Sequence, residues 1–116
     1  MQIIEVNDIK LYANHGCLEE ESLIGGEYKV DVRLWVDFSE AGRTDKLKAT
    51  IDYVRVNEIV EQQMLKRSKL IEHAGYRIMN ALKTEFPQCE KIRVKVIKLS
   101  PPINGNVDNV AIIIEE

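Results

Sequence analysis

The segment EYKVDVRLWVDFS, residues 27–39, carries the clearest structural pattern in this chain. Apolar residues occupy every second position, and charged residues with one tryptophan occupy the positions between them. Because successive side chains of a strand point to opposite faces of a sheet, this period of two predicts a long strand with one buried face. The other face is polar, which favours an antiparallel sheet that is partly exposed to water. The apolar set is Tyr28, Val30, Val32, Leu34, Val36 and Phe38, and the set between is Lys29, Asp31, Arg33, Trp35 and Asp37.

Three further segments have the pattern of strands. Residues 3–12 are predicted to form a strand that is interrupted at Asn7 and Asp8. Residues 91–99 alternate between apolar and basic residues, and residues 107–115 give a last apolar strand. Together with the first segment, these make four strands.

Two helices are predicted between the second and the third strand. Apolar residues recur at spacings of three and four over residues 56–64 and again over residues 70–82, as on the buried face of a helix. Ser68 could cap the second helix, and Pro87 would end it.

The order of elements is therefore strand, strand, helix, helix, strand, strand. It predicts a single α+β domain over residues 1–116, with a four-stranded antiparallel sheet and two helices on one of its faces. Residues 13–26 are expected to form a loop, and residues 40–52 are expected to be irregular. A long sheet with a half-polar free face could also line an oligomeric barrel.

The composition excludes several classes of protein. With 45% hydrophobic and 30% charged residues, the 116-residue chain has a soluble globular mix, and its net charge of −3 argues against a nucleic-acid binder. The N-terminus lacks the pattern of a signal peptide, and no apolar run is long enough for a membrane span, so we expect a cytoplasmic protein without a membrane partner. In that compartment Cys17 and Cys89 are expected to be free thiols.

The usual catalytic motifs are missing. His15 and His73 are the only histidines, and although His15 and Cys17 could supply two metal ligands, no pattern completes the set, so we expect no metal. A Cys–His nucleophilic pair at these two positions is less convincing than a small buried thiol beside a turn. The glycines at 25 and 26 precede a strand rather than a helix, unlike a phosphate-binding loop.

A few dispersed polar residues remain as candidates. Three glutamates stand in a row at residues 19–21, Tyr53 precedes the first helix, Glu72 lies in the first turn of the second helix, and Lys98 ends the third strand. Each has an ordinary structural interpretation. Glu72 could offset the helix dipole, for example, and Lys98 could be a solvated residue beside a turn.

Their order along the chain resembles the dihydroneopterin aldolase family. The resemblance covers nearly the whole chain and rests on four stretches that are individually weak but together specific. They are HGCLEEESLIGGEYKVDV (15–32), SEAGRTDKLKATIDY (39–53), LIEHAGYRI (70–78) and KLSPPINGNVDNVAIIIE (98–115). They match the family's His-Gly loop with its later glutamate, the Tyr before the first helix, the Glu that starts the second helix, and the Lys ahead of a Pro-Pro turn.

This resemblance implies a tunnelling fold, in which four subunits join their sheets into a barrel, and therefore a homo-tetramer or homo-octamer with active sites between subunits. It also implies retro-aldol cleavage of 7,8-dihydroneopterin, a small-molecule pterin, to 6-hydroxymethyl-7,8-dihydropterin and glycolaldehyde. The substrate carries its own C=N electron sink, so no cofactor, metal or lysine Schiff base is expected.

Site residues follow by resemblance, position by position. Glu72 would anchor the pterin through two parallel hydrogen bonds, and Ile71 would add backbone contacts beside it. Lys98 would be the general acid/base, and Tyr53, from the adjacent subunit, would handle a proton near the pterin. Glu21 would be the substrate-side glutamate, and the two glutamates before it would face solvent.

Two departures and two alternatives stay open at this stage. The family often has Tyr before His-Gly, where this chain has Asn14, and its last turn commonly reads Pro-Gly-His, where this chain has residues 104–106, Asn-Gly-Asn. An epimerase acting at C2′ of dihydroneopterin or its triphosphate would use the same acid/base groups. A non-catalytic ring-forming pterin-binding protein would keep the fold without the chemistry.

Overall fold

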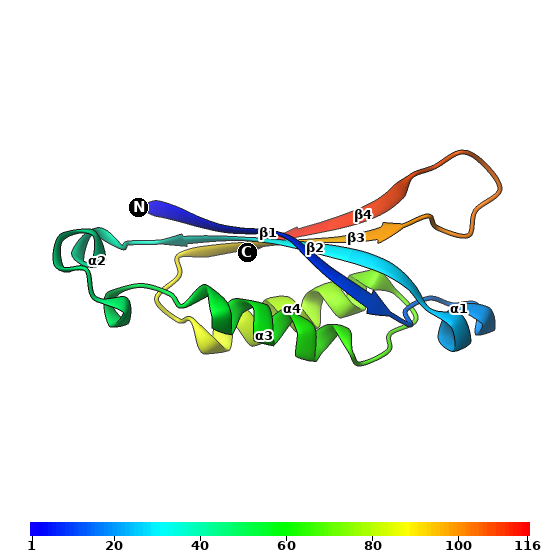
Figure 1. The fold of residues 1–116 in the computed structure, drawn as a ribbon, viewed down its shortest axis with the longest axis horizontal. Helices are drawn as coiled ribbons and strands as arrows, with labels where there is room; N and C mark the ends of the chain where they lie inside the picture. Colours follow the sequence, from blue (N-terminus) through cyan, green and yellow to red (C-terminus); the bar gives the residue numbers. More distant parts are fainter.

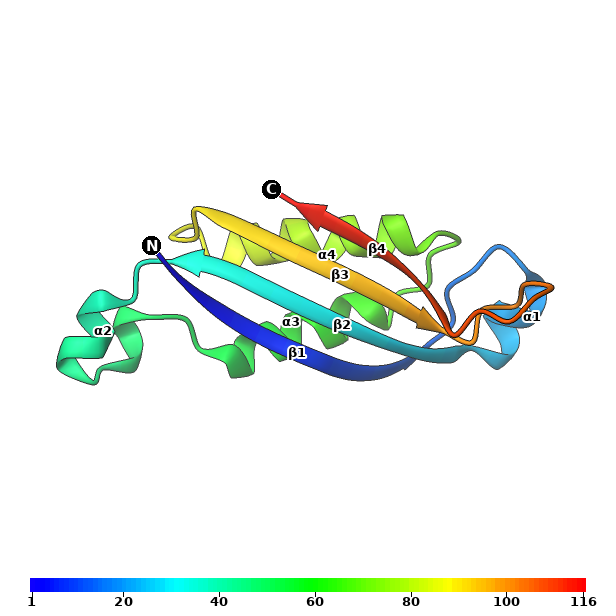
Figure 2. The ribbon, with the colours of Figure 1, turned by 90° about the horizontal axis from the view of Figure 1, so that it is seen from above.

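Four antiparallel strands organise the computed structural model, which describes residues 1–116. They are β1 (Gln2–Ala13), β2 (Gly26–Val36), β3 (Lys91–Leu99) and β4 (Asn109–Glu115). The strands lie side by side in chain order, so that β2 and β3 are central and β1 and β4 form the edges (Figures 1 and 2). The predicted antiparallel sheet is confirmed.

Two helices cover one face of this sheet. They are α3 (Tyr53–Met64) and α4 (Ile71–Glu85), and Figure 1 shows both on the same side of the four strands. The opposite face carries no helix (Figure 1). The molecule is elongated, with extents of 52 × 25 × 21 Å, and its two shorter helices, α1 (Glu19–Ile24) and α2 (Ser39–Thr44), lie at opposite ends.

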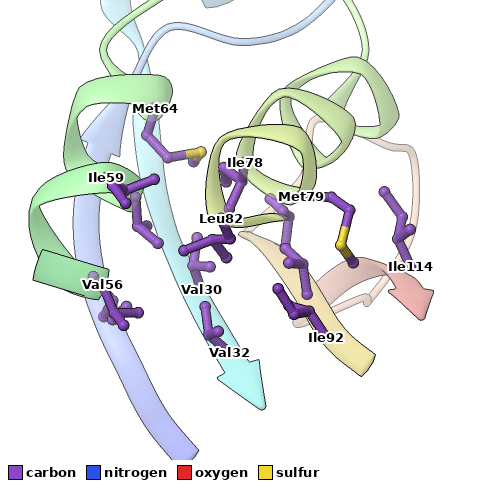
Figure 3. Packing of buried hydrophobic residues seen from close by; sticks show 14 of the residues in the cluster. Val30, Val32, Val56, Ile59, Met64, Ile78, Met79, Leu82, Ile92 and Ile114 are labelled. Atoms are coloured by element: carbon purple, nitrogen blue, oxygen red, sulfur yellow. The ribbon is translucent and has the colours of Figure 1, made fainter. Parts of the chain in front are cut away.

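The core fills the space between the sheet and the two helices (Figure 3). The alternating apolar residues of β2 face the helical stripes there, and both sets are almost completely buried. These stripes therefore pack as their periods predicted, except at Leu70, which was predicted to belong to the second stripe but precedes α4 and is 51% exposed. The labelled members in Figure 3 are Val30, Val32, Val56, Ile59, Met64, Ile78, Met79, Leu82, Ile92 and Ile114.

The predicted interruption of the first strand is a β-bulge. The pairing of β1 with β2 shifts register between Val6 and Ile9, and Asp8 adopts a left-handed backbone conformation with φ of 56°. The Asp8 N–H donates a hydrogen bond of 2.7 Å to Asp31 Oδ1 on β2. An Asn-Asp pair tolerates this geometry because short polar side chains are the ones most often found there.

Several predicted boundaries are wrong. The loop predicted over residues 13–26 contains the short helix α1, and the irregular segment 40–52 overlaps α2 and also includes a 3₁₀ turn, Leu47–Ala49. The second strand ends at residue 36 rather than 39, and the last strand begins at residue 109 rather than 107.

Ser68 does not cap the second helix. That helix begins at Ile71, with Leu70 in the capping position and no side-chain cap. The Ser68 hydroxyl instead accepts a hydrogen bond of 2.8 Å from Arg77 and shares another of 2.8 Å with His73 Nδ1. These tertiary partners take the hydroxyl away from the backbone N–H groups that a capping serine would bind.

None of the helices combines the length and the apolar character needed to cross a membrane.

Candidate functional site

Lys98 lies near the end of β3, on the face of the strand that is buried against the helices. Ile92, Val94 and Val96 point into the core, and Lys98 follows in the same phase, opposite Tyr28 of β2. Only 16% of its side chain is exposed. Its ammonium pairs with Glu21 and lies 3.4 Å from the His15 carbonyl oxygen, to which it donates. The alternative interpretation of Lys98 as a solvated residue beside a turn is therefore wrong.

Glu21 reaches this lysine from helix α1. Its side chain is 14% exposed, whereas Glu19 and Glu20 are exposed, as predicted. One carboxylate oxygen contacts Lys98, and the other accepts a hydrogen bond of 3.2 Å from the Leu18 N–H. Burial raises the pKa of this carboxyl, but the hydrogen bonds from Lys98 and Leu18 outweigh it and hold the pKa below its usual value. Glu21 is therefore ionised at neutral pH.

Gly16 makes room for the Glu21 carboxylate. Its φ of 138° belongs to a region that favours glycine. A Cβ atom at this position would overlap the carboxylate of Glu21. The glycine of the His-Gly pair is thus required by the close approach of Glu21 to the loop.

His15 supplies the carbonyl that joins the group. Its oxygen accepts from Lys98 and also from the Tyr28 hydroxyl, at 2.9 Å. The ring is 1% exposed, and its Nδ1 accepts a hydrogen bond of 3.0 Å from the Ser68 N–H. Burial, followed by the positive charges of Arg77 and Lys98, lowers the pKa of His15 to about 4. The imidazole is therefore neutral at physiological pH.

These groups line a pocket of about 460 Å³ at one end of the sheet. His15, Glu21, Tyr28 and Lys98 contribute to its wall, and the turn after β3 closes another side. Glu20 also lines it, although its side chain is largely exposed. An ammonium and a carboxylate at the wall of a pocket can donate and accept protons, and the His15 carbonyl holds the ammonium in place.

Ile71 and Glu72 lie at the start of α4, next to this group but outside the pocket wall. Ile71 is buried and Glu72 is exposed in the first helical turn. The segment before α4 is bound to the His-Gly loop, because the Gly16 N–H donates to the Ser68 carbonyl at 3.0 Å and Arg67 donates to the Gly16 carbonyl at 2.7 Å. The start of α4 is thereby fixed beside the pocket.

Tyr53 is not brought together with Lys98 within one chain. It begins α3, and the start of this helix lies toward α2 and away from α1 (Figure 1). Its side chain is 67% exposed. Lys98 and Glu21 therefore meet within the chain, whereas Tyr53 is exposed at the start of α3.

No three His, Cys, Asp or Glu side chains come together in a way that could hold a metal ion. His15 and Cys17 also do not pair, because the Cys17 thiol contacts the Lys69 carbonyl while the His15 ring binds Ser68. Both cysteines are free thiols, as predicted, but Cys17 is exposed, so the prediction of a buried thiol there is wrong.

Sequence reasoning missed three contributors to this site. His15 was considered only as a metal ligand or a catalytic base, Tyr28 only as a core residue, and Arg67 not at all. The main-chain carbonyls of Asn14, His15 and Gly16, which these residues bind or supply, leave no trace in the residue types. One signal was available for their common partner Lys98. It follows the apolar positions of an alternating strand, and a lysine in that phase is a candidate for a buried charge that needs polar neighbours.

The comparisons with known proteins agree with one another. The family model described as "FolB: Dihydroneopterin aldolase" matches residues 4–115. A Bacillus subtilis protein named dihydroneopterin aldolase is 36% identical over 97% of this chain and 94% of its own length, and one from Staphylococcus epidermidis is 37% identical over 95% and 92%. The fold of E. coli dihydroneopterin aldolase, solved in complex with neopterin, matches with a TM-score of 0.92 at 21% identity, covering 100% of this chain and 99% of that one.

Proposed function

This chain belongs to the dihydroneopterin aldolase family, and we propose that it performs that family's reaction at the Lys98–Glu21 pair. It is accordingly a carbon–carbon lyase of folate biosynthesis. The substrate is 7,8-dihydroneopterin, and the products are 6-hydroxymethyl-7,8-dihydropterin and glycolaldehyde. The observation that carries the proposal is the buried contact of Lys98 with Glu21 and the His15 carbonyl, at the wall of a pocket.

The chemistry requires little beyond proton transfer. The bond that breaks joins the first two carbons of the substrate's side chain, and loss of the proton from the second carbon's hydroxyl starts the cleavage. The electron pair left on the first carbon moves into the neighbouring C=N bond of the pterin and forms an enamine. Protonation of that carbon then gives the hydroxymethyl product. Each positioned acid or base contributes about 10²- to 10⁴-fold to such a reaction.

Lys98 is the general acid/base in this proposal, acting directly or through a water molecule. Its ammonium is held by Glu21 and the His15 carbonyl, so a bound substrate meets a fixed donor rather than a mobile surface lysine. Glu21, ionised at neutral pH, orients Lys98 and has lone pairs left for the hydroxylated tail of the substrate.

Glu72 anchors the pterin, with Ile71 offering backbone groups beside it. A carboxylate can accept two parallel N–H bonds from the amino edge of a pterin, and the exposed Glu72 has a free carboxylate for this purpose. Tyr53 comes from the neighbouring subunit of a homo-tetramer or homo-octamer. Its exposure, and the position of the start of α3 on the side of the molecule away from α1, support this arrangement (Figure 1). The free thiols fit a cytoplasmic enzyme.

Incubation of the purified protein with dihydroneopterin tests the reaction. We expect glycolaldehyde and hydroxymethyl-dihydropterin in equal amounts, whereas an epimerase would change only the configuration at C2′. Lys98→Ala should depress kcat with a smaller effect on pterin affinity, because it removes the acid/base group. Glu72→Gln should mainly weaken the affinity for substrate and product, because it removes one acceptor. The reverse pattern would mean that the two roles are exchanged.

The same assay tests the absence of metal and of a covalent intermediate. Because the substrate supplies the electron sink, activity should survive EDTA, and borohydride should trap no adduct on Lys98. Loss of turnover after EDTA that zinc restores, or a trapped lysine adduct in the mass spectrum, would overturn this mechanism.

A further inference from the structure

His15 contacts both parts of the proposed site, namely the Lys98–Glu21 pair and the segment that leads into α4 and Glu72. Its carbonyl oxygen accepts from Lys98 Nζ at 3.4 Å and from the Tyr28 hydroxyl at 2.9 Å. Its ring Nδ1 accepts from the Ser68 N–H at 3.0 Å, on the segment that leads into α4. The main chain of His15 therefore binds Lys98 and Tyr28, and its side chain binds the segment that leads into α4.

The segment around Ser68 is joined to the His-Gly loop by further bonds. The Gly16 N–H returns a hydrogen bond to the Ser68 carbonyl, and Arg67 donates to the carbonyls of Asn14 and Gly16 at 3.1 and 2.7 Å. Ser68 is itself buried, at 6% exposed, and stands four residues before Glu72. A shift of this segment would move the start of α4 relative to Lys98.

We propose, on the basis of the function given above, that His15 is a positioning residue for the cleavage. Its ring holds the start of α4, which carries Glu72, and its carbonyl holds the Lys98 ammonium. One residue thus sets the spacing between the pterin anchor and the acid/base group. Misplacement of reacting groups by about 1 Å can cost on the order of a hundredfold in rate, so this spacing matters for catalysis.

The geometry also fixes the chemical form that His15 needs. Because the Ser68 N–H is a donor, Nδ1 must be unprotonated, and a neutral ring then carries its proton on Nε2. Nε2 is buried and has no hydrogen bond of ordinary geometry, although a contact with the Met64 carbonyl acts to raise the pKa of the ring. A replacement must therefore preserve the acceptor at the δ position, which makes the stronger bond.

Two substitutions separate these features. His15→Asn keeps an acceptor near the place of Nδ1, whereas His15→Phe fills the volume and leaves the Ser68 N–H without a partner. We expect His15→Phe to lower kcat/KM at least tenfold, through kcat and through affinity for hydroxymethyl-dihydropterin together. His15→Asn should stay within about threefold of wild type. Equal losses of kcat/KM in the two variants, or a His15→Phe enzyme with wild-type kinetics, would overturn the proposal.

A double-substitution cycle distinguishes positioning from a general role in folding. In a Lys98→Ala background, His15→Phe should cause little further loss of kcat in single-turnover measurements, while its effect on product affinity should persist. Independent, multiplicative losses of kcat would show that His15 does not act through Lys98. If His15→Phe does not fold, His15→Gln serves in its place, because its amide lies one bond further out and also leaves Ser68 unpaired.

The outcome for Lys98 separates this proposal from the function on which it rests. A Lys98→Ala enzyme with full activity would reject the acid/base assignment itself. An impaired Lys98→Ala enzyme beside wild-type kinetics in both His15 variants would reject only the positioning role.

Discussion

Glu21 differs from its two neighbours in position alone. It is the third residue of α1, where its side chain turns back toward Leu18 and Lys98, while Glu19 and Glu20 point into solvent. Identical chemistry at three consecutive positions gives a matched set of variants. The consequences of removing each carboxylate follow from what it contacts.

We expect Glu21→Ala to lower kcat/KM by about tenfold or more, because an unpaired donor in the site costs about 1–3 kcal/mol. Glu19→Ala should behave like wild type, since an exposed carboxylate contributes within about 0.5 kcal/mol. Glu20→Ala is also expected near wild type, although Glu20 lines the pocket rim. Steady-state kinetics and melting curves check this set. Equal losses at all three positions would show that the helix acts through its net charge.

Gly16 offers an independent way to displace the same carboxylate. The added methyl group of Gly16→Ala would occupy the space of the Glu21 carboxylate, at a position where φ is also unfavourable for alanine. The variant should therefore lose at least as much activity as Glu21→Ala, and it should also melt at a lower temperature. Gly42→Ala is the control, because a Cβ there meets nothing within 4 Å. Full activity in Gly16→Ala would mean that Glu21 is not needed where the structure places it.

At the scale of elements, Asp52 determines where α3 begins. Its carboxylate accepts a hydrogen bond of 2.9 Å from the Val54 N–H, so it caps the helix, and Tyr53 is the first helical residue. The cap fixes the backbone from which Tyr53 projects. The orientation of a proposed catalytic residue thus depends on an exposed aspartate.

Asp52→Ala should cost about 0.5–2 kcal/mol of stability, the usual value of a lost helix cap. Asp52→Asn should retain most of the stability that the cap provides, because asparagine caps equally well. Denaturant titrations of both variants measure the difference. Identical midpoints for Asp52→Ala and wild type would show that the cap contributes nothing here.

Long periodic elements were predictable from sequence, and short ones were not. The alternation in β2 and the stripes of α3 and α4 average over many residues, and each matched the structure. Helix α1 has only six residues and no buried ones, so it has no stripe. Its signals were the three acids of its first turn and Gly25, whose N–H binds the Glu21 carbonyl with φ of 78°.

The site was predictable in its residue types and not in its connections. Lys98 and Glu21 are 77 positions apart, and only the sheet and α1 bring them into contact. The role of the His15 carbonyl is carried by main-chain atoms, which every residue has. The choice of Glu21 among its neighbours and of Ile71 came from the resemblance to a family, as did the roles of Glu72, Tyr53 and Lys98, and all of these roles stay predictions.

At the scale of the whole molecule, stability should depend on pH through His15. The ordinary histidine pKa of 6.5 falls to about 4 in the folded state, so the unfolded chain binds more protons between these values. The contribution of His15 to the free energy of unfolding is complete above pH 6.5 and is lost as the pH falls toward 4. At about 1.4 kcal/mol per unit of pKa shift, this loss reaches up to about 3 kcal/mol. Denaturant titrations at fixed protein concentration and several pH values should show that the free energy of unfolding depends less on pH in His15→Asn than in wild type. Parallel curves would contradict it.

The edges of the sheet are open to partner chains. β1 and β4 each have one unpaired side, and they expose apolar residues such as Ile3, Val110 and Ile113. An exposed apolar edge is a place where another strand can pair, and joining β1 of one chain to β4 of the next would cover both edges. We expect at least four chains per particle in light scattering at micromolar concentration. An active monomer would contradict this.

An oligomer that shares sites makes a sharper prediction, because two inactive variants can then repair each other. Lys98→Ala chains still carry Tyr53, and Tyr53→Phe chains still carry Lys98 and Glu21. If each site takes Lys98 from one chain and Tyr53 from its neighbour, random mixing restores about a quarter of the sites. Formation of hydroxymethyl-dihydropterin after co-refolding of the two variants measures this.

The control is a mixture of Lys98→Ala with Glu21→Ala. These two side chains touch within a single chain, so every site that regains one of them lacks the other, and the mixture should show no more activity than the two variants measured separately. Restoration in the first mixture without restoration in the second would assign Lys98 and Glu21 to one side of the interface and Tyr53 to the other. Failure of the first mixture, despite mixed particles in native mass spectrometry, would place all three in one chain or remove Tyr53 from the site. Since α3 begins on the side of the molecule away from α1, whose Glu21 contacts Lys98, we expect the first result (Figure 1).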